Sequence, residues 1–319
     1  HTTVSRAFRG NCSIKPDTYE KVMQAAKRLN YSPNTIAASL RGQKTHTIGL
    51  VIQNPHVKLF IDLVHELDRE LKNHQYRMLV SFGDFDPVLT YQSVKAMVEA
   101  KVDSVVYMPT YPDFFQGNMS WLTDSNVQLL QIINAQRSEY SSFVFNDTAG
   151  TRIGMQHLLD KGHTRILMLG GENRVEGYYA AYREAGIEPP IPYESLEGLD
   201  RKSMRRKIRI LLETHKPTAV FSISDDVSIL TYGVFNEMGL RTPDDVSFLT
   251  FDDTTWAESL RISTIGHPVH AMARAIVRQI REYSEDTEQE YASSSIVSFC
   301  PYLIERKSVC QLTAREAET

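Results

Sequence analysis

Acidic side chains follow several apolar runs of this sequence, where they could bind or convert a small molecule. Asp225 and Asp226 come after one run, Asp252 and Asp253 come after another, and Arg174 follows a third. Paired carboxylates can act as a general acid and base, but they also accept hydrogen bonds from sugar hydroxyls without any reaction. Asp225 and Asp252 could equally cap the helices that follow them. The pattern indicates a polar binding site and leaves its chemistry open.

Motifs of common enzymes do not occur in the sequence. The glycines around Arg174 match neither the dinucleotide-binding pattern nor the P-loop, and no nucleophile elbow or H-E-x-x-H is present. The ten histidines are scattered, and His267 and His270 have no third metal ligand near them in sequence. Three widely spaced cysteines argue against a disulfide framework. We therefore expect no enzyme activity, no catalytic residue, no metal and no cofactor.

Alternating strands and helices must position the polar side chains. Apolar runs at 47–52, 76–81, 103–108, 127–133, 165–170, 218–223 and 246–251 predict strands, and helical patterns lie at Leu59–Asn73, Val88–Ala100, Ala149–Lys161, Arg201–Thr214 and Asp226–Met238. This order favours parallel βαβ units with both sheet faces covered, as one barrel or as two doubly wound lobes. Ligands bind at the carboxyl ends of such strands, where Asn54, Asp84 and Thr110 also lie.

The first 44 residues differ from the remainder in charge. Their net charge is +6, whereas residues 45–319 carry −10, which indicates a basic module for a polyanion attached to an acidic body. A helix bearing Thr2, Thr3, Ser5 and Arg6 could lie in the DNA major groove, where arginine reads guanine. A second helix is predicted from Ile14 to Leu29. This order fits part of a helix-turn-helix module.

Length and composition set the protein class. The chain has 319 residues, of which 42% are apolar and 23% charged, which suits two or three globular domains. No run of eighteen apolar residues occurs, so we expect no membrane span. The first residues lack a signal-peptide pattern, so we expect a cytoplasmic location.

Several segments together resemble the LacI/GalR family of transcription regulators. TVSRAFRG, RLNYSPNTIAASLRG and THTIGLVI resemble its headpiece, hinge and first core strand, and FNDTAGTRIGMQHLLDKGHTRILMLGG, SDDVSILTYGVFNEMGLRTPDDVSFLTFDD and PYLIERKS resemble its core. The likeness covers residues 1–308 in the family's order. It implies an α/β fold: a two-lobed, periplasmic-binding-protein-like core of doubly wound parallel sheets behind a small helical headpiece. It also implies that the first helix of the helix-turn-helix is missing from this sequence.

The resemblance assigns DNA contacts to the N-terminal segments. It makes His1, Thr2 and Arg6 base-reading candidates, and it gives Thr3, Ser5 and Asn11 to phosphate contacts or to bracing the module. Residues from Pro33 to Gly42 resemble the hinge helix, in which Asn34 and Ala37 are further DNA candidates. Leu40 matches the leucine that wedges into the minor groove, although contact between paired hinge helices would also explain it.

The resemblance also selects among the residues that follow the strands. Arg174 looks like the main ligand-gripping arginine, and Asp225 and Asp252 match the two acidic ligand positions. Phe60 matches an aromatic residue that stacks on the ligand, whereas Phe221 is explained equally well by core packing. Asn54, Asp84 and Thr110 remain candidates in ligand-facing loops. Two departures stand out: Val57-Lys58-Leu59-Phe60 replaces an N-P-F-F run, and Lys15 replaces a hydroxyl cap, which should cost the following helix about 1 kcal/mol.

The family pattern implies a domain division. We expect a partial headpiece at 1–32, a hinge at 33–45, a core at 46–308 and a tail at 309–319. The N-lobe would hold about 46–147 plus 267–290, and the C-lobe about 148–266 plus 291–308. The tail lacks leucine heptads, so a homodimer is expected rather than a tetramer.

The expected function is a ligand-responsive transcription regulator that acts as a repressor. It would bind operator DNA as a homodimer, and it would bind a sugar or sugar derivative between its lobes. A sugar-binding solute receptor is the alternative. It accounts for the core but leaves residues 1–44 unexplained.

Overall fold

The computed structural model describes residues 14–29, 44–111, 127–171, 174–285 and 294–312, together with Val4, Ala7 and Ser125. Near the N-terminus it contains one described helix, α2 (Pro16–Arg28). Lys15 is the N-cap of this helix and makes no side-chain capping bond, as the sequence predicted. Pro16 occupies the first helical position and Asp17 the first turn, where both residues favour helix initiation.

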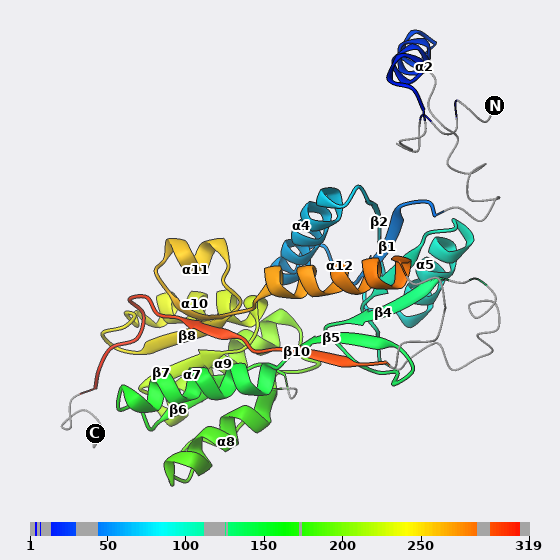
Figure 1. The fold of residues 1–319 in the computed structure, drawn as a ribbon. Coiled ribbons are helices and arrows are strands. Elements are labelled where there is room, and N and C mark those ends of the chain that lie inside the picture. Colours follow the sequence, from blue (N-terminus) through cyan, green and yellow to red (C-terminus); the bar gives the residue numbers. More distant parts are fainter. Residues whose placement is uncertain are drawn as a thin grey trace.

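The core contains two separate sheets, which confirms two lobes and excludes a single barrel (Figure 1). The first sheet has the order β10-β5-β4-β3-β1-β2, and all its strands pair in parallel. Its elements, which form the N-lobe, are β1 (Thr47–Ile52), α4 (Lys58–Asn73), β2 (Arg77–Phe82), α5 (Pro87–Glu99), β3 (Ser104–Tyr107), β4 (Gln128–Ile132), β5 (Ser141–Phe145), α12 (Val269–Glu285) and β10 (Ile296–Phe299).

The second sheet has the order β11-β9-β8-β7-β6, in which only β11 runs antiparallel to its neighbour. Its elements, which form the C-lobe, are α7 (Asp147–Asp160), β6 (Ile166–Leu169), α8 (Val175–Ala185), α9 (Arg201–His215), β7 (Ala219–Ser222), α10 (Asp225–Met238), β8 (Ser247–Phe251), α11 (Thr255–Ser259), β9 (Ser263–Gly266) and β11 (Tyr302–Ile304). The seven strands and five helices predicted from sequence are present, with small shifts at their ends.

Each lobe buries apolar side chains on both faces of its sheet. In the N-lobe, Leu63 and Ile276 join the cluster beneath α4 and α12, whereas Val94 belongs to the cluster beneath α5. In the C-lobe, Phe248 lies in the cluster under α9 and α10, and Phe251 lies in the cluster under α7 and α8. A buried side chain of this size contributes about 1.5–3 kcal/mol to the free energy of unfolding. The two faces explain why the central strands are apolar throughout.

The chain passes between the lobes three times. The crossovers lie at 146–147, between β5 and α7; at 267–268, between β9 and α12; and at 300–301, between β10 and β11. Strand β10 pairs with β5 in the first sheet, so the prediction that 291–308 belongs to the C-lobe is wrong for this strand. The third crossover comes after β10 and not before it, so only β11 and the residues after it join the second lobe.

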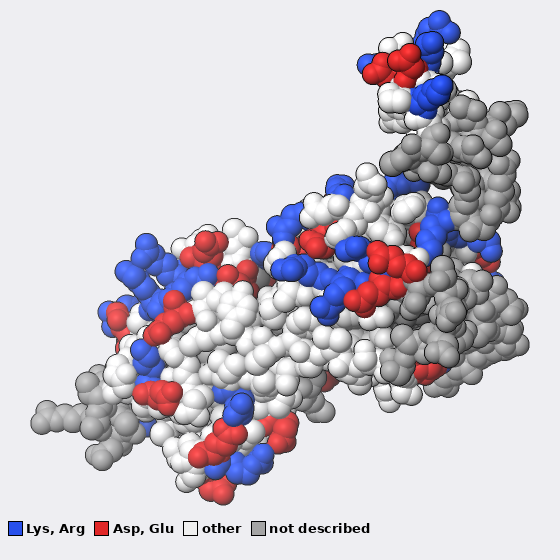
Figure 2. Space-filling model, viewed as in Figure 1, with Lys and Arg blue, Asp and Glu red and all other residues white. Residues whose placement is uncertain are grey.

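Among the described residues, no helix is both long enough and apolar enough to span a bilayer. The visible surface of the core carries Lys and Arg mixed with Asp and Glu (Figure 2). Along α12, Arg278 lies 3.9 Å from Glu282 and Arg281 lies 3.3 Å from Glu285. Such exposed pairs contribute little to stability, and they are typical of a solvated helix face.

Candidate ligand-binding cleft between the lobes

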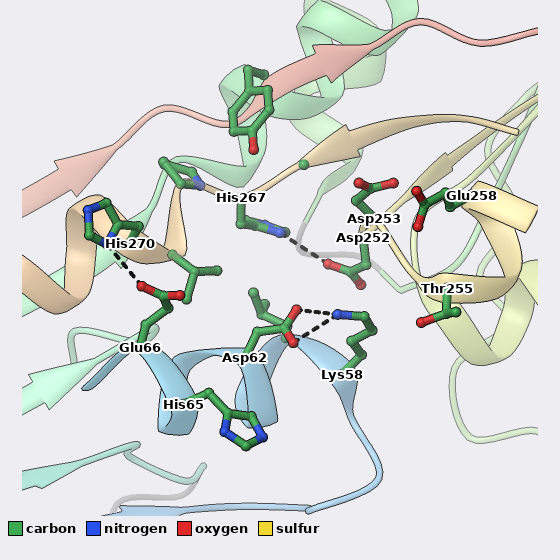
Figure 3. Close-up of a pocket in the computed structure, with 15 residues that line it drawn as sticks. Lys58, Asp62, His65, Glu66, Asp252, Asp253, Thr255, Glu258, His267 and His270 are labelled. Atoms are coloured by element: carbon green, nitrogen blue, oxygen red, sulfur yellow. Dashed lines mark hydrogen bonds and ion pairs between the residues drawn. The ribbon is translucent and has the colours of Figure 1, made fainter. Parts of the chain in front are cut away.

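A cavity of about 470 Å³ lies where the two lobes meet (Figure 3). Helix α4 forms its N-lobe wall, and the loop after β8 together with α11 forms its C-lobe wall. This volume falls in the range of small-molecule sites. Its lining residues are Lys58, Leu59, Asp62, His65, Glu66, Asp252, Asp253, Thr255, Glu258, Gly266, His267, Pro268, Val269, His270 and Tyr302.

Much of the charge in this lining is paired within the protein. Lys58 Nζ lies 2.6 Å from Asp62 Oδ2, one helical turn along α4. His270 Nδ1 lies 2.9 Å from Glu66 Oε2 and ties α12 to α4. On the C-lobe side, Arg306 lies 2.7 Å from Asp253 Oδ1. Acidic and basic groups therefore alternate around the cavity, which suits a ligand that both donates and accepts hydrogen bonds.

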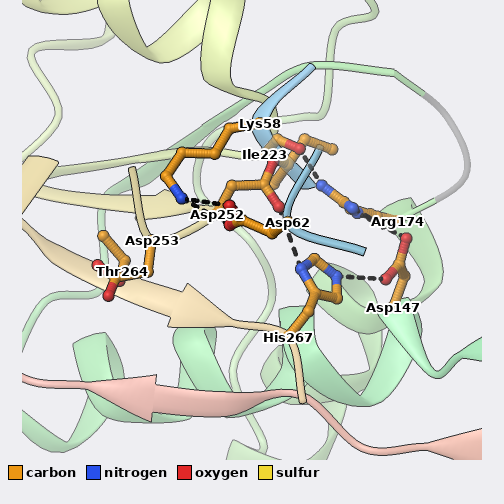
Figure 4. Close-up of polar contacts among 9 residues, drawn as sticks. All are labelled: Lys58, Asp62, Asp147, Arg174, Ile223, Asp252, Asp253, Thr264 and His267. Carbon is orange, nitrogen blue, oxygen red and sulfur yellow. Dashed lines mark hydrogen bonds and ion pairs between the residues drawn. The ribbon is translucent and has the colours of Figure 1, made fainter. Parts of the chain in front are cut away.

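Arg174 lies at the N-terminus of α8 and is nearly buried (Figure 4). Its Nε and Nη2 donate to Asp147 Oδ2 at 3.0 and 2.9 Å, and its Nη1 donates to the carbonyl oxygen of Ile223. The guanidinium also lies over the ring of Phe251, 3.9 Å from the centroid, which is a cation–π distance. Gly177 permits the close approach of α8 to α7, because a Cβ there would lie 2.5 Å from Thr148 O. Arg174 is thus held by three different contacts.

Asp147 and Asp252 both face His267 in the second crossover. Asn146 caps α7 by accepting a hydrogen bond from Ala149 N, which fixes Asp147 in the first turn. Asp147 Oδ1 lies 3.2 Å from His267 Nε2. Asp252 follows β8 with a φ of 66°, and its Oδ1 lies 3.1 Å from His267 Nδ1, as an ion pair without good hydrogen-bond geometry. The imidazole therefore lies between two carboxylates.

This arrangement shifts the pKa values of the histidine and its first partner. Burial alone would lower the pKa of His267, but Asp147 and Asp252 together outweigh burial and raise it. Burial alone would raise the pKa of Asp147, but His267 and Arg174 overcome burial and lower it. Both shifts favour the charged forms of His267 and Asp147, which lie between Arg174 and Asp252.

Asp225 is the second acidic residue that the sequence predicted at this site. It begins α10, and its Oδ1 accepts a hydrogen bond from Trp256 Nε1 at 2.6 Å. Burial raises the pKa of Asp225, and the negative charges of Asp252 and Asp226 raise it further. The negative charge of Asp252 therefore acts on the Asp225 carboxyl, as expected for two residues that follow neighbouring strands.

The remaining predicted ligand residues lie at different distances from the cleft. Phe221 is fully buried and stacks on Phe251, which agrees with its core-packing alternative. Phe60 is also buried, in the N-lobe core, with its ring 6.3 Å from that of Phe85. Asn54 accepts a hydrogen bond from His56 N in the turn before α4. Of the eight predicted ligand residues, only Asp252 lines the cavity itself.

Asp84 follows β2 and Thr110 follows β3, the strands on either side of β1 in the N-lobe sheet. The buried side chain of Gln53 organises their loops, since its Nε2 donates to Met108 O at 2.6 Å and its Oε1 accepts from Phe85 N at 2.8 Å. Asp84 has a φ of 51°, and its backbone N–H donates to Gln53 O. Thr110 is buried. Gln53 thus positions both predicted residues, although the sequence gave no reason to single it out.

Four other residues of the cleft were also missed. Asp147 was not considered, and His267 was considered only as a metal ligand. Lys58 was noted as a departure and Trp256 was not considered. Asp147, His267 and Trp256 each contact a partner that is far away in sequence. Lys58 is the exception, because its partner Asp62 lies one turn along the same helix. Only a helical-spacing argument for Lys58 and Asp62 was within reach of the sequence.

The predicted DNA contacts His1, Thr2, Thr3, Ser5, Arg6, Asn11, Asn34, Ala37 and Leu40 lie outside the described residues. In the same segment, Val4 and Ala7 are helical, Val4 is exposed and Ala7 is buried. In α2, Ala26 is buried, whereas Leu29, which follows the helix, is 71% exposed. The base-reading roles remain predictions.

Comparisons with known proteins agree with this architecture. Residues 1–34 match the family model for bacterial regulatory proteins of the lacI family, and residues 155–309 match that for a periplasmic binding protein-like domain. A probable HTH-type transcriptional repressor, ExuR of Bacillus subtilis, is 29% identical, over 98% of this chain and 96% of its own. Catabolite control protein A of Priestia megaterium is 25% identical, over 95% and 93%.

Solved structures share the fold. The Lac repressor bound to ONPG superimposes with a TM-score of 0.78 at 22% identity, over 97% of this chain and 95% of that chain. A complex of the transcriptional regulator CelR with cellobiose gives 0.69, also at 22% identity, over 96% and 95%. The relatives are named as transcription regulators and not as enzymes, which agrees with the sequence analysis. The chain therefore combines a DNA-binding segment of the lacI family of bacterial regulatory proteins with a periplasmic binding protein-like domain, in that order.

Proposed function

We propose that this protein is a cytoplasmic transcriptional repressor that binds operator DNA as a homodimer and senses a small molecule in the cleft between its lobes. One observation carries the sensing part: Arg174, Asp147, His267 and Asp252 form a continuous polar chain beside a cavity of about 470 Å³. Two of these residues belong to crossovers, so a ligand that touches the chain acts on the connection between the lobes.

The DNA-binding part is supported by charge and by family. Residues 1–44 carry a net charge of +6, and residues 1–34 match the lacI family model. Arg6 would read a base edge, and Leu40 would wedge into the minor groove from a hinge at 33–45. The headpiece would occupy 1–32. Neutralising phosphates with these basic side chains makes operator affinity fall steeply with salt.

A sugar or sugar derivative is the proposed effector. The lining supplies paired carboxylates and cations, which match the hydroxyl groups of a sugar as both donors and acceptors. Relatives support the same class, since one is a ribose operon repressor of Haemophilus influenzae and one structure contains cellobiose. Arg174 and Asp252 would contact the ligand, with Asp225 at the edge of the site.

The homodimer would form through the free edge of the N-lobe sheet. Strand β2 ends that sheet and exposes Leu79 and Phe82, which are 44% and 43% exposed. Phe85, in the following loop, is 52% exposed. Exposed apolar residues on an unpaired edge strand favour association with a second copy. Two copies would present two headpieces to a palindromic operator.

Effector binding would then alter DNA affinity by linkage. The ligand shifts the equilibrium between two arrangements of the lobes only as far as it binds one arrangement better than the other. Because the N-lobe carries the hinge and headpiece, the preferred arrangement sets the spacing of the paired headpieces. Operator affinity and effector affinity must change each other by the same factor.

One titration tests the proposal. Operator DNA is selected from a random pool with the full chain, and binding is measured by fluorescence anisotropy at about 50 and 200 mM salt. A screen of sugars, sugar acids and nucleosides by thermal shift supplies the ligand, which is then added to the complex. We expect salt-sensitive binding that the ligand changes about 5–150-fold. Ligand binding without any DNA affinity would favour the solute-receptor alternative.

A further inference from the structure

The ring of His267 lies between aromatic and acidic groups from both lobes. Phe145, at the end of β5, and Phe251, at the end of β8, lie with ring centroids 4.5 and 5.5 Å from its own. Asp147 faces one ring nitrogen at 3.2 Å and Asp252 faces the other at 3.1 Å. The His267 side chain is 1% exposed, whereas those of Asp147 and Asp252 are 25% and 13% exposed.

An ionised carboxylate only accepts hydrogen bonds, whereas a neutral imidazole carries one donor and one acceptor nitrogen. With the neutral ring, one carboxylate would face a nitrogen lone pair in a buried site. The protonated ring donates a hydrogen bond to Asp147, and its positive charge attracts Asp252 across the 3.1 Å contact. The geometry therefore selects the imidazolium form.

The other charged groups around His267 are already engaged. Arg174 reaches it only through Asp147, to which two of its nitrogens donate. On α4, Lys58 pairs with Asp62, and on the loop after β8, Asp253 pairs with Arg306. On α12, which follows His267, His270 pairs with Glu66. No other cation of the described residues contacts Asp252, so its partner is His267.

We propose that His267 is a positioning residue of the effector site: its positive charge joins the first crossover to the end of β8 and thereby holds Asp252, and through Asp147 also Arg174, in place. This inference rests on the proposed function of the cleft. It gives the second crossover a role beyond connecting the lobes. It also makes the positions of Asp252 and Arg174, the two candidate ligand-binding residues, depend on pH.

The direction of that dependence follows from linkage. The carboxylates raise the pKa of His267 above its value of 6.5, so the folded chain keeps a proton that the unfolded chain releases. The ion pairs of protonated His267 with Asp147 and Asp252 contribute fully to the stability of the folded chain below pH 6.5. This contribution is lost as pH rises through the raised pKa of His267. Between these two values, the folding equilibrium constant falls by up to about tenfold per pH unit relative to a chain without this histidine.

The first test follows the histidine itself. NMR spectra of the full chain, with ¹³C-labelled histidine, are recorded from pH 5 to 10 without ligand, and the His267 signal is identified by its loss in His267→Gln. Should that variant not fold, Asp147→Asn identifies the signal as the one that it moves. We expect a midpoint above 6.5 that drops in Asp252→Asn. A midpoint at or below 6.5, or one unmoved in Asp252→Asn, overturns the proposal.

The second test separates charge from packing. Thermal midpoints of the parent, His267→Gln and the exposed control His56→Gln are compared from pH 6 to 9. We expect the parent to exceed His267→Gln at pH 6 and this difference to shrink as pH rises, with His56→Gln following the parent. A difference that is the same at every pH contradicts the proposal. Since no ligand is present, failure of the effector screen leaves both results intact.

Discussion

Arg174 directs its Nε and Nη2 to the same carboxylate oxygen of Asp147, at 3.0 and 2.9 Å. The residue predicted to grip the ligand is therefore already occupied by the first crossover. A ligand oxygen that binds Arg174 must share the guanidinium with Asp147 or displace it. In the proposed function, this one pair would couple ligand binding to the crossover between the lobes.

The first prediction concerns removal of this pair. In Arg174→Met the alkyl chain still covers Phe251, but Asp147 loses its main partner inside a nearly closed site, which should lower the free energy of unfolding by about 3 kcal/mol. Ligands found by the thermal-shift screen should no longer raise the melting temperature of this variant. Arg183→Met is the matched control, because Arg183 lies on the same helix in an exposed pair with Glu176. Equal ligand stabilisation in both variants would place the site elsewhere.

The second prediction uses Trp256 as a reporter of Asp225. Because Trp256 Nε1 donates to the Asp225 carboxylate, protonation of Asp225 should change the Trp256 emission. Burial raises the pKa of Asp225 above 3.8, so the midpoint of the emission change should lie above that value. Asp225→Asn should abolish the change, and Asp226→Asn should keep it at a somewhat lower pH. A midpoint at or below 3.8 would contradict the assignment.

The same emission titration connects Asp225 to His267. Asp252 raises the pKa of Asp225 through its negative charge, and His267 offsets that charge. In His267→Gln the midpoint should therefore move upward, because Asp252 then repels the Asp225 carboxylate without compensation. His270→Gln should leave the midpoint unchanged. A downward shift in His267→Gln would show that His267 does not neutralise Asp252.

The third prediction concerns the N-terminal end of α2. Lys15 occupies the N-cap with an extended ψ of 139° but offers no acceptor to the first free N–H groups. Lys15→Ser should stabilise this helix by about 1 kcal/mol, since a hydroxyl can accept a hydrogen bond from the first turn. Lys21→Ser, on an exposed position of the same helix, should not stabilise it. Circular dichroism of a peptide spanning 12–31 measures both changes, and equal helicity in the two variants would refute the capping argument.

Elements that have a local hydrophobic pattern could be predicted from the sequence alone. Strands β1, β3, β7 and β8 are apolar because both faces of their sheets are covered, and each was predicted. Strand β10 was missed because its exposure alternates and Ile296 is 66% exposed, so it gives no continuous apolar run. Its membership of the N-lobe follows only from pairing with β5, which no local pattern reveals.

The cleft was predictable only in part, for a similar reason. Asp225, Asp252 and Arg174 were identifiable because each follows a strand or begins a helix. The contact of His267 with Asp147 joins residues 120 positions apart, and periodicity carries no information about such a pair. Phe221 illustrates a choice that the sequence left open, and its burial agrees with the core-packing alternative.

The fourth prediction tests the proposed dimer edge. Leu79 is exposed on β2, the last strand of the N-lobe sheet, where a second copy would cover it. Leu79→Lys should weaken dimerisation by tenfold or more, because a charged side chain on an edge strand opposes pairing and becomes costly to bury. Sedimentation velocity over a range of concentrations measures the effect.

The matched control for this edge is Ile187→Lys, which places the same charge at another exposed apolar residue, after α8 in the C-lobe. It should leave dimerisation unchanged. If Leu79→Lys dimerises as the parent does, the β2 edge is not the interface, and Ile229 on α10, which is 43% exposed, becomes the next position to change. Because paired headpieces bind a palindromic operator together, Leu79→Lys should also weaken operator binding at concentrations where the parent is dimeric, whereas Ile187→Lys should not.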